Sequence, residues 1–200
     1  MKISALYRGV GTMLFAVTAA LLLVSCASTD EKYFLNTDSD ANVYVAPTGS
    51  GNISKIAIMP FKGPTELIGQ SVSDMFVTEI LRSQYYELVE RSQMANVLSE
   101  SELSLSGLSA TKAAEVGGMM GADGVMIGTV SEYETVAARG RAIPVVGISA
   151  RLIDCKTGKI VWSVDLAKRA SSGGMTLSEH GRAVVHEMMA GLYKKLRSVR

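Results

Sequence analysis

The residues whose chemistry could support catalysis or metal binding are few, and their spacing suits neither role. His180 and His186 are six residues apart, which on a helix places them roughly 120° apart around the axis. They cannot share a metal ion without other ligands. Glu132 and Glu134 point to the same side of a predicted strand, where a solvated edge is more common than an acid–base pair. The sequence contains no Gly-x-Ser-x-Gly nucleophile elbow.

A run of glycines at 117–124 is the other pattern that could do chemistry, because glycine-rich loops cradle phosphate groups. Such a cradle needs a strand first and a helix second, so that the N-terminus of the helix points at the anion. Here a helical pattern comes first, so we expect these glycines to end a helix and lead into a strand. We therefore predict no cofactor, no metal ion, no small-molecule substrate and no enzymatic activity.

The charge balance argues against a further class of partner. The chain has 200 residues and a net charge of +1, and its acidic and basic residues are interspersed. A nucleic-acid binder usually shows a basic patch or stripe, so nucleic acid is not an expected partner. With 48% hydrophobic residues, a chain of this length suits one globular domain with an additional segment.

The N-terminal residues are typical of a targeting signal. Lys2 and Arg8 supply positive charge, and the apolar stretch at 10–24 is too short for a membrane span of about 20 residues. The stretch Leu23–Cys26 resembles the lipobox of bacterial lipoproteins. We predict that residues 1–25 are a signal peptide and that Cys26 is acylated and holds the protein on a membrane. The alternative is an uncleaved anchor with a chance cysteine.

The second cysteine, Cys155, then has no intramolecular partner, so we expect no disulfide. It lies at the end of a predicted strand without a histidine nearby in the sequence. We interpret it as a small structural residue; the alternative is a reactive thiol.

The composition at 26–54 predicts a flexible tether after the lipidated cysteine. This segment carries acidic residues, Pro47 and a Gly/Ser run, and the only strand-like alternation in it is Val43–Val45. Its 28 residues after Cys26 have a root-mean-square reach of roughly 30 Å as a flexible chain. Residues 55–200 are then the folded domain.

The first part of this domain alternates between strand and helix patterns. The expected elements are a strand at Ile56–Phe61 buried on both faces, a helix over Ile68, Val72, Met75, Phe76 and Ile80 to about Ser83, a strand at 85–91, a helix starting with Met94, Val97 and Leu98, a helix capped by Ser109, and a strand at 122–134. The order β-α-β-α-α-β implies parallel strands joined by crossover helices.

The second part of the domain has a different pattern. Residues 142–170 form two long strand patterns around a turn in which Gly158 suits a positive φ, as in an antiparallel hairpin. Apolar residues at helical spacing from Val184 to Leu196 predict a C-terminal helix that ends in basic residues. The fold class is therefore α/β, a mixed β-sheet with helices packed on it.

Several stretches in series resemble one protein family. The residues are 56–61 (IAIMPF), 76–81 (FVTEIL), 85–100 (YYELVERSQMANVLSE), 121–134 (GADGVMIGTVSEYE) and 148–162 (ISARLIDCKTGKIVW). Together they resemble the CsgG family, named for the curli-secretion lipoprotein, and the likeness covers 55–196. More distantly, the chain resembles LpoB-type activators of penicillin-binding proteins and the N-terminal domain of TolB. The resemblance implies a periplasmic α/β domain without cofactor or catalysis, in proteins that usually work as oligomers at the outer membrane.

The chain departs from the curli-secretion channel at the membrane-crossing hairpins. Each crossing strand needs about 9–11 residues with an apolar side facing lipid. The available segment at 134–147 is too short for two such strands and carries Glu134, Arg139 and Arg141. The chain after Trp162 runs through 168–174 into the last helix. We therefore expect the periplasmic domain of the family without its membrane hairpins.

These patterns leave two functional hypotheses. The first is a scaffold or accessory lipoprotein, held on the periplasmic face of the outer membrane, that serves the secretion or assembly of a surface structure. It would form homo-oligomers and contact other envelope proteins. The second is an LpoB-like activator of a penicillin-binding protein, which would need a longer tether to cross the cell wall. Ala27, by resemblance to enterobacterial sorting, favours the outer membrane. Ser149, Arg151, Arg169 and the predicted loop 139–141 are candidate contact residues.

Overall fold

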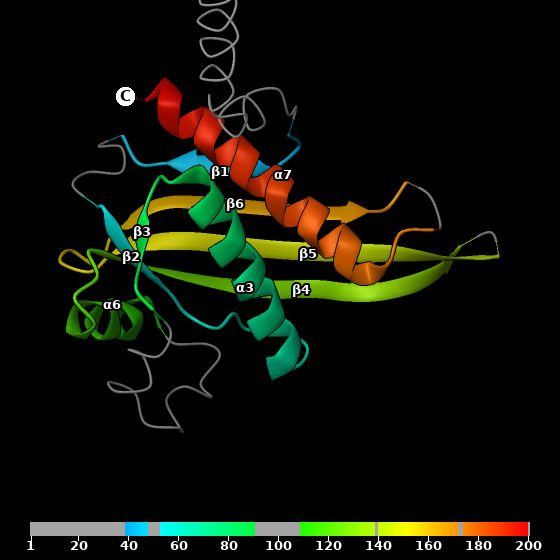
Figure 1. Ribbon diagram of the computed structural model, residues 1–200, viewed down its shortest axis with the longest axis horizontal. Helices are drawn as coiled ribbons and strands as arrows, with labels where there is room; N and C mark the ends of the chain where they lie inside the picture. Colours follow the sequence, from blue (N-terminus) through cyan, green and yellow to red (C-terminus); the bar gives the residue numbers. More distant parts are fainter. Residues whose placement is uncertain (1–38, 48–52, 91–108, 139, 172–173, 200) are drawn as a thin grey trace, which may run out of the picture.

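The computed structural model describes residues 39–47, 53–90, 109–138, 140–171 and 174–199, which form a mixed six-stranded sheet with three helices (Figure 1). In chain order the elements are β1 (Asn42–Val45), β2 (Lys55–Ile58), α3 (Glu66–Ser83), β3 (Glu87–Leu88), α6 (Ala110–Met119), β4 (Gly124–Ala138), β5 (Arg141–Asp154), β6 (Ile160–Arg169) and α7 (Leu177–Ser198). The strand order is β1-β6-β5-β4-β2-β3. The predicted fold class, a mixed α/β sheet with a hairpin and a C-terminal helix, is confirmed.

The sheet combines the two kinds of strand pairing that the sequence predicts. β2 pairs in parallel with both β3 and β4, whereas β4, β5 and β6 follow one another in antiparallel order. The turn between β5 and β6 contains Gly158 at a φ of 67°, as its position in the hairpin pattern predicts. β2 ends at Ile58, before the predicted Phe61, because Pro60 has no N–H to donate to a ladder.

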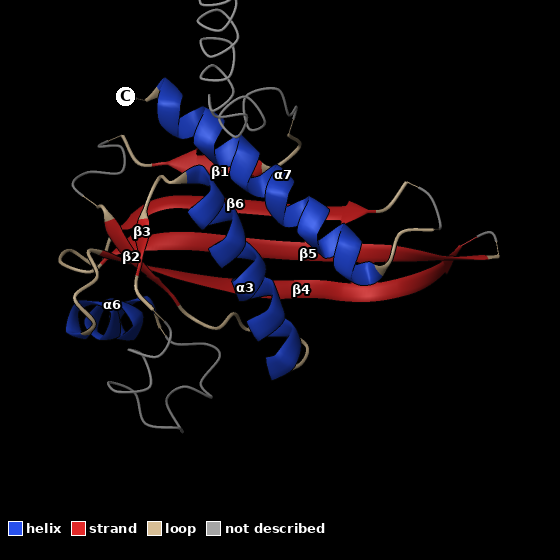
Figure 2. Ribbon diagram, in the orientation of Figure 1, coloured by secondary structure: helices blue, strands red, loops and turns tan. Residues whose placement is uncertain are grey.

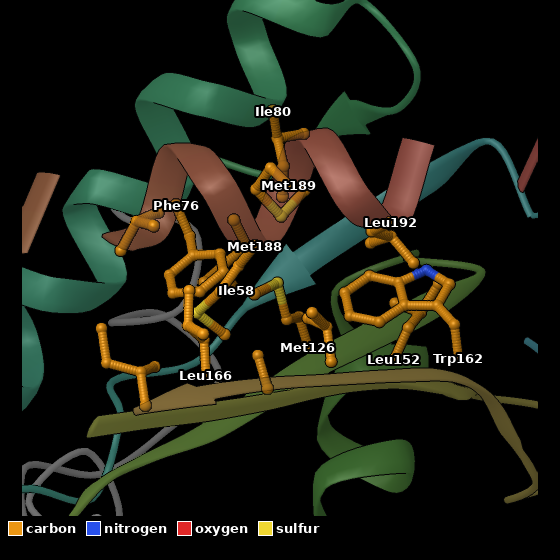
Figure 3. Packing of buried hydrophobic residues seen from close by; sticks show 14 of the residues in the cluster. Ile58, Phe76, Ile80, Met126, Leu152, Trp162, Leu166, Met188, Met189 and Leu192 are labelled. Atoms are coloured by element: carbon orange, nitrogen blue, oxygen red, sulfur yellow. The ribbon is translucent and has the colours of Figure 1, made fainter. Parts of the chain in front are cut away.

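Helices cover the two faces of the sheet unequally (Figure 2). α3 and α7 pack on one face over the larger core, and α6 packs on the other face against the smaller cluster around Val125. Figure 3 shows Trp162 and Leu152 of the sheet facing Leu192 of α7. Trp162 is fully buried, and its indole N–H donates a 3.1 Å hydrogen bond to the hydroxyl of Tyr86. The largest apolar side chain of the core is thus also satisfied as a hydrogen-bond donor.

An edge strand lies within the segment that the sequence assigns to the tether. β1 pairs antiparallel with β6, with Tyr44 opposite Ser163. Val43 and Val45 pack against the larger core, while Tyr44 lies on the other side of the strand and is 54% exposed. The folded part of the chain therefore starts earlier than the boundary predicted at residue 55, because an alternation of so few residues is a weak signal.

Three other strands differ in length from the sequence-based expectation. β3 has two residues instead of the expected strand at 85–91. β4 and β5 are longer than expected, because residues 134–147 continue their hairpin to a turn at Gly140 rather than forming a loop. The long hairpin extends beyond the helices at one end of the sheet (Figure 1). The helix expected around 94–98 lies outside the described residues.

Side-chain caps fix the starts of the helices. Ser109 caps α6 as predicted, with its hydroxyl accepting a hydrogen bond from the amide of Lys112. At the start of α7, Thr176 and Glu179 form a reciprocal capping box. Hydrogen bonds from the amide and hydroxyl of Thr176 lower the pKa of Glu179, so this cap keeps its charge at neutral pH.

The glycines of α3 and α6 provide a matched test of this packing. A Cβ at Gly69 would overlap the carbonyl oxygen of Phe61, so Gly69→Ala must push α3 away from the sheet. We expect it to lower the free energy of unfolding by about 2–3 kcal/mol in a denaturant titration. Gly118→Ala in α6 meets no atom within 4 Å, and should raise the same free energy by up to about 1 kcal/mol. Equal effects of the two substitutions would contradict the close approach of α3.

Candidate functional site

The chain reaches the folded domain through a polar cluster on α7. The carboxylate of Glu187 accepts hydrogen bonds from Lys168 Nζ at 2.8 and 2.9 Å and from the amide of Asp40 at 3.1 Å. The hydroxyl of Ser39 donates to the backbone carbonyl of Glu187 at 2.9 Å. Lys168 Nζ also lies 3.4 Å from a carboxylate oxygen of Asp40. We call Ser39, Asp40, Lys168 and Glu187 the Glu187 cluster.

The Glu187 cluster joins three parts of the fold that are distant in sequence. Lys168 comes from the end of β6 and Glu187 from the middle of α7, whereas Ser39 and Asp40 precede β1. The hydrogen bond to Glu187 raises the pKa of the Lys168 ammonium, so this ammonium stays charged at neutral pH. A Cβ at Gly191 would lie 2.7 Å from the hydroxyl oxygen of Ser39, so this glycine permits the close approach. The sequence gives no signal for these contacts, because Ser39 and Asp40 resemble the polar residues before them.

A cavity of about 240 Å³ lies beside the Glu187 cluster. Its lining includes Lys168, Ala170, Met175, His180, Val184 and Glu187. The Nε2 of His180 lies 2.9 Å from the carbonyl oxygen of Lys168, and the carboxylate of Glu187 binds the ammonium of Lys168. These polar groups are therefore already engaged with one another.

The two histidines lie in separate environments, as their spacing predicts. His180 contacts Lys168, whereas Nδ1 of His186 lies 3.0 Å from a carboxylate oxygen of Glu79 on α3. The other carboxylate oxygen of Glu79 binds Arg82 of the same helix at 2.7 Å. Glu79 therefore links α3 to α7 through its contact with His186. Among the residues that the structure describes, no group of three or more His, Cys, Asp and Glu side chains is arranged to hold a metal ion.

The other residues that the sequence singles out have structural surroundings. Cys155 follows β5, and its burial raises the pKa of the thiol to about 11, which fits the prediction of a small structural residue. The glycine run ends α6 and leads into β4, as predicted, and Gly121 within it has a φ of 68°. Glu132 and Glu134 are both exposed on β4.

The candidate contact residues do not form one site. Ser149 and Arg151 are exposed on β5, Arg169 is exposed at the end of β6, and Arg141 is exposed at the start of β5 near the hairpin turn. Arg139 lies outside the described residues. Cys26 does as well, so its lipidation stays a prediction.

Comparisons with known proteins agree with the α/β architecture. The family model described as "Curli production assembly/transport component CsgG" matches residues 52–191. The chain therefore belongs to the CsgG family. No curated protein sequence shows significant similarity to the chain. In the described part of the chain, no helix has both the length and the apolar character that a membrane span requires.

Solved structures share this fold at low sequence identity. The PelC dodecamer from Paraburkholderia phytofirmans (L103M form) has a TM-score of 0.52 at 18% identity, covering 75% of this chain and 96% of that chain. Lipoprotein GNA1162 from Neisseria meningitidis has a TM-score of 0.50 at 19% identity, covering 72% of this chain and 99% of that chain. The LpoB C-terminal domain from Salmonella enterica has a TM-score of 0.44 at 16% identity, covering 57% and 82%.

The Glu187 cluster predicts how firmly the segment before β1 is held. Glu187→Gln removes the charge that binds Lys168, and we expect it to lower the free energy of unfolding by about 1 kcal/mol. Hydrogen exchange should become faster at the amides of Asp40 and Ala41 in particular. Glu115→Gln, which breaks the exposed pair with Lys112 on α6, is the matched control and should leave these amides unchanged. Unchanged exchange in Glu187→Gln would show that β1 alone holds the segment.

The raised pKa of Cys155 predicts slow alkylation. In the full chain carrying Cys26→Ser, Cys155 is the single thiol, and a pKa of about 11 leaves little thiolate at pH 8. We expect iodoacetamide to react about a hundredfold more slowly with the folded than with the urea-unfolded protein. The folded-state rate should rise with pH up to about 11. Equal rates in the two states at pH 8 would contradict the burial of this thiol.

Proposed function

We propose that the protein is a lipoprotein held on the periplasmic face of the outer membrane, where it acts as a non-catalytic scaffold or accessory component in secretion or assembly of a cell-surface structure. The observation that carries this proposal is the CsgG family match over 52–191, which spans nearly the whole folded part of the chain. That family is described by its role in curli production assembly and transport. The engaged state of the polar groups around Glu187 supports a role without catalysis.

The scaffold would work as a homo-oligomer. PelC, which shares the fold, is a dodecamer in two crystal forms. A ring of identical subunits arises when one surface of a subunit binds a different surface of the next. The long β4–β5 hairpin is one such surface. A second is the side of β5 and β6 away from α7, with the exposed Ser149 and Arg151, which we call the open sheet face. Association with other envelope proteins would then use the surface of the assembled ring.

The small number of residues between Cys26 and Ser39 supports a location close to the membrane. Ser39 follows Cys26 by 13 positions, so the chain between these two residues spans at most about 45 Å when fully extended. A short tether argues against the alternative of an LpoB-like activator that reaches a penicillin-binding protein at the inner membrane.

The proposal is tested by crosslinking in intact cells followed by purification through a C-terminal tag. We expect the protein to be found in the outer-membrane fraction and to be recovered as self-crosslinked oligomers with secretion or outer-membrane components. Cys26→Ser should move it out of the membrane fraction because the acyl chains are lost. Cys155→Ser is the matched control and should stay in the membrane fraction.

Two results would overturn the proposal. Membrane association that persists in Cys26→Ser would show that the protein is held by something other than lipidation. Recovery of a penicillin-binding protein as the main crosslinked partner would favour the activator instead.

A further inference from the structure

The C-terminal end of α7 carries a group of basic residues near the point where the chain enters the domain. Lys194 and Lys195 are exposed, and Arg197 is half-buried. Val199, which follows the helix, is 39% exposed. The end of α3 is held beside this region by a 2.7 Å hydrogen bond from the hydroxyl of Ser83 to that of Tyr193. We call Lys194, Lys195 and Arg197 the basic end of α7.

The basic end lies on the same side of α7 as the entering chain. Ser39 packs against Gly191, and Lys194 and Lys195 follow this glycine by three and four residues. Residues at these spacings share one stripe of a helix. At a rise of 1.5 Å per residue, the two lysines lie only about 5 Å further along the axis than Gly191. Ser39, the first residue that the structure describes, therefore lies close to the two exposed lysines.

We propose that the basic end of α7 rests on the anionic headgroups of the membrane leaflet that holds the acyl chains of Cys26. This inference rests on the lipid anchor of the proposed function. A Lys or Arg near an anionic membrane surface contributes attraction that is modest for each residue. Because only 12 residues lie between Cys26 and Ser39, the domain stays close to the membrane, and even this modest attraction is sufficient to orient it. The domain then presents the same side to the bilayer, and the β4–β5 hairpin and the open sheet face are left for protein partners.

Complementing the helix dipole is the other explanation for basic residues at this position. Lys195 and Arg197 lie in the last turn of α7, where cations favour the negative end of the dipole. That explanation does not account for the position of both exposed lysines close to Ser39. The two explanations differ in what they predict for lipid charge, because the helix dipole acts equally in the absence of a membrane.

The test uses the acylated full-length protein in vesicles and a fluorescent probe at either end of α7. Ser198→Cys places the probe at the basic end, and Ser178→Cys places it in the first turn of the same helix, about 30 Å away along the axis. Both variants carry Cys155→Ser, and the vesicles contain a headgroup-labelled quencher lipid. We expect strong quenching at residue 198 with phosphatidylglycerol present, little with phosphatidylcholine alone, and little at residue 178 in either case.

Charge variants identify the residues that make the contact. With two lysines neutralised, Lys194→Gln/Lys195→Gln should lower the ratio of docked to undocked domain by about thirtyfold. Lys156→Gln/Lys159→Gln in the β5–β6 turn removes the same charge and is the matched control, which should leave the ratio unchanged. Flotation of each variant with the vesicles reports the lipid anchor independently of docking.

Three outcomes would overturn the inference. The first is equal quenching at residues 198 and 178, or quenching that does not depend on phosphatidylglycerol. If the protein still floats with the vesicles, either result would exclude docking through α7 while the lipid anchor stays intact. Equal effects of the two double-lysine variants would assign any attraction to net charge alone. A purified protein without acyl mass at Cys26 that fails to float would overturn both the anchor and this inference.

Discussion

Burial of one side of α7 against the sheet is the interaction on which the rest of this structure depends. Val185, Met188, Met189, Leu192 and Tyr193 of α7 are all fully or almost fully buried. Each such side chain contributes about 1.5–3 kcal/mol when it is removed from water. The same helix holds the entering chain through Glu187 and the end of α3 through Tyr193. Without α7, the larger core would lose one wall and the edge strand β1 would lose the contacts that keep it in place.

Much of the fold follows from strong local patterns in the sequence. The apolar period at 184–196 predicts α7, and the apolar run from Ile56 predicts β2. The turn at Gly158 is also found where the sequence predicts it. Two kinds of feature could not be predicted. β1 has only four residues, and the outer part of the β4–β5 hairpin carries Glu134 and Arg141 among its apolar residues. Both gain their stability from pairing with strands that are already formed, which a local pattern does not reveal.

The candidate site was less predictable than the fold, for a related physical reason. Lys168 and Glu187 meet because β6 ends under the middle of α7, and Ser39 reaches them because Gly191 leaves room. These residues are 19 to 148 positions apart in sequence, so their meeting depends on the tertiary structure. The angular separation of the two histidines needed less information, because it follows from their spacing on one helix. Their partners, the carbonyl of Lys168 and the carboxylate of Glu79, again depend on the tertiary structure.

Several polar groups in the described part of the chain are engaged within the fold. His180 is bound to a backbone carbonyl, Lys168 to Glu187, and the thiol of Cys155 is kept neutral by its surroundings. The contacts of Lys168 join parts of the fold that are distant in sequence, because its carbonyl oxygen meets His180 and its ammonium binds Glu187, both on α7. Glu187 also holds Ser39 and Asp40, so the end of β6, α7 and the segment before β1 are positioned together.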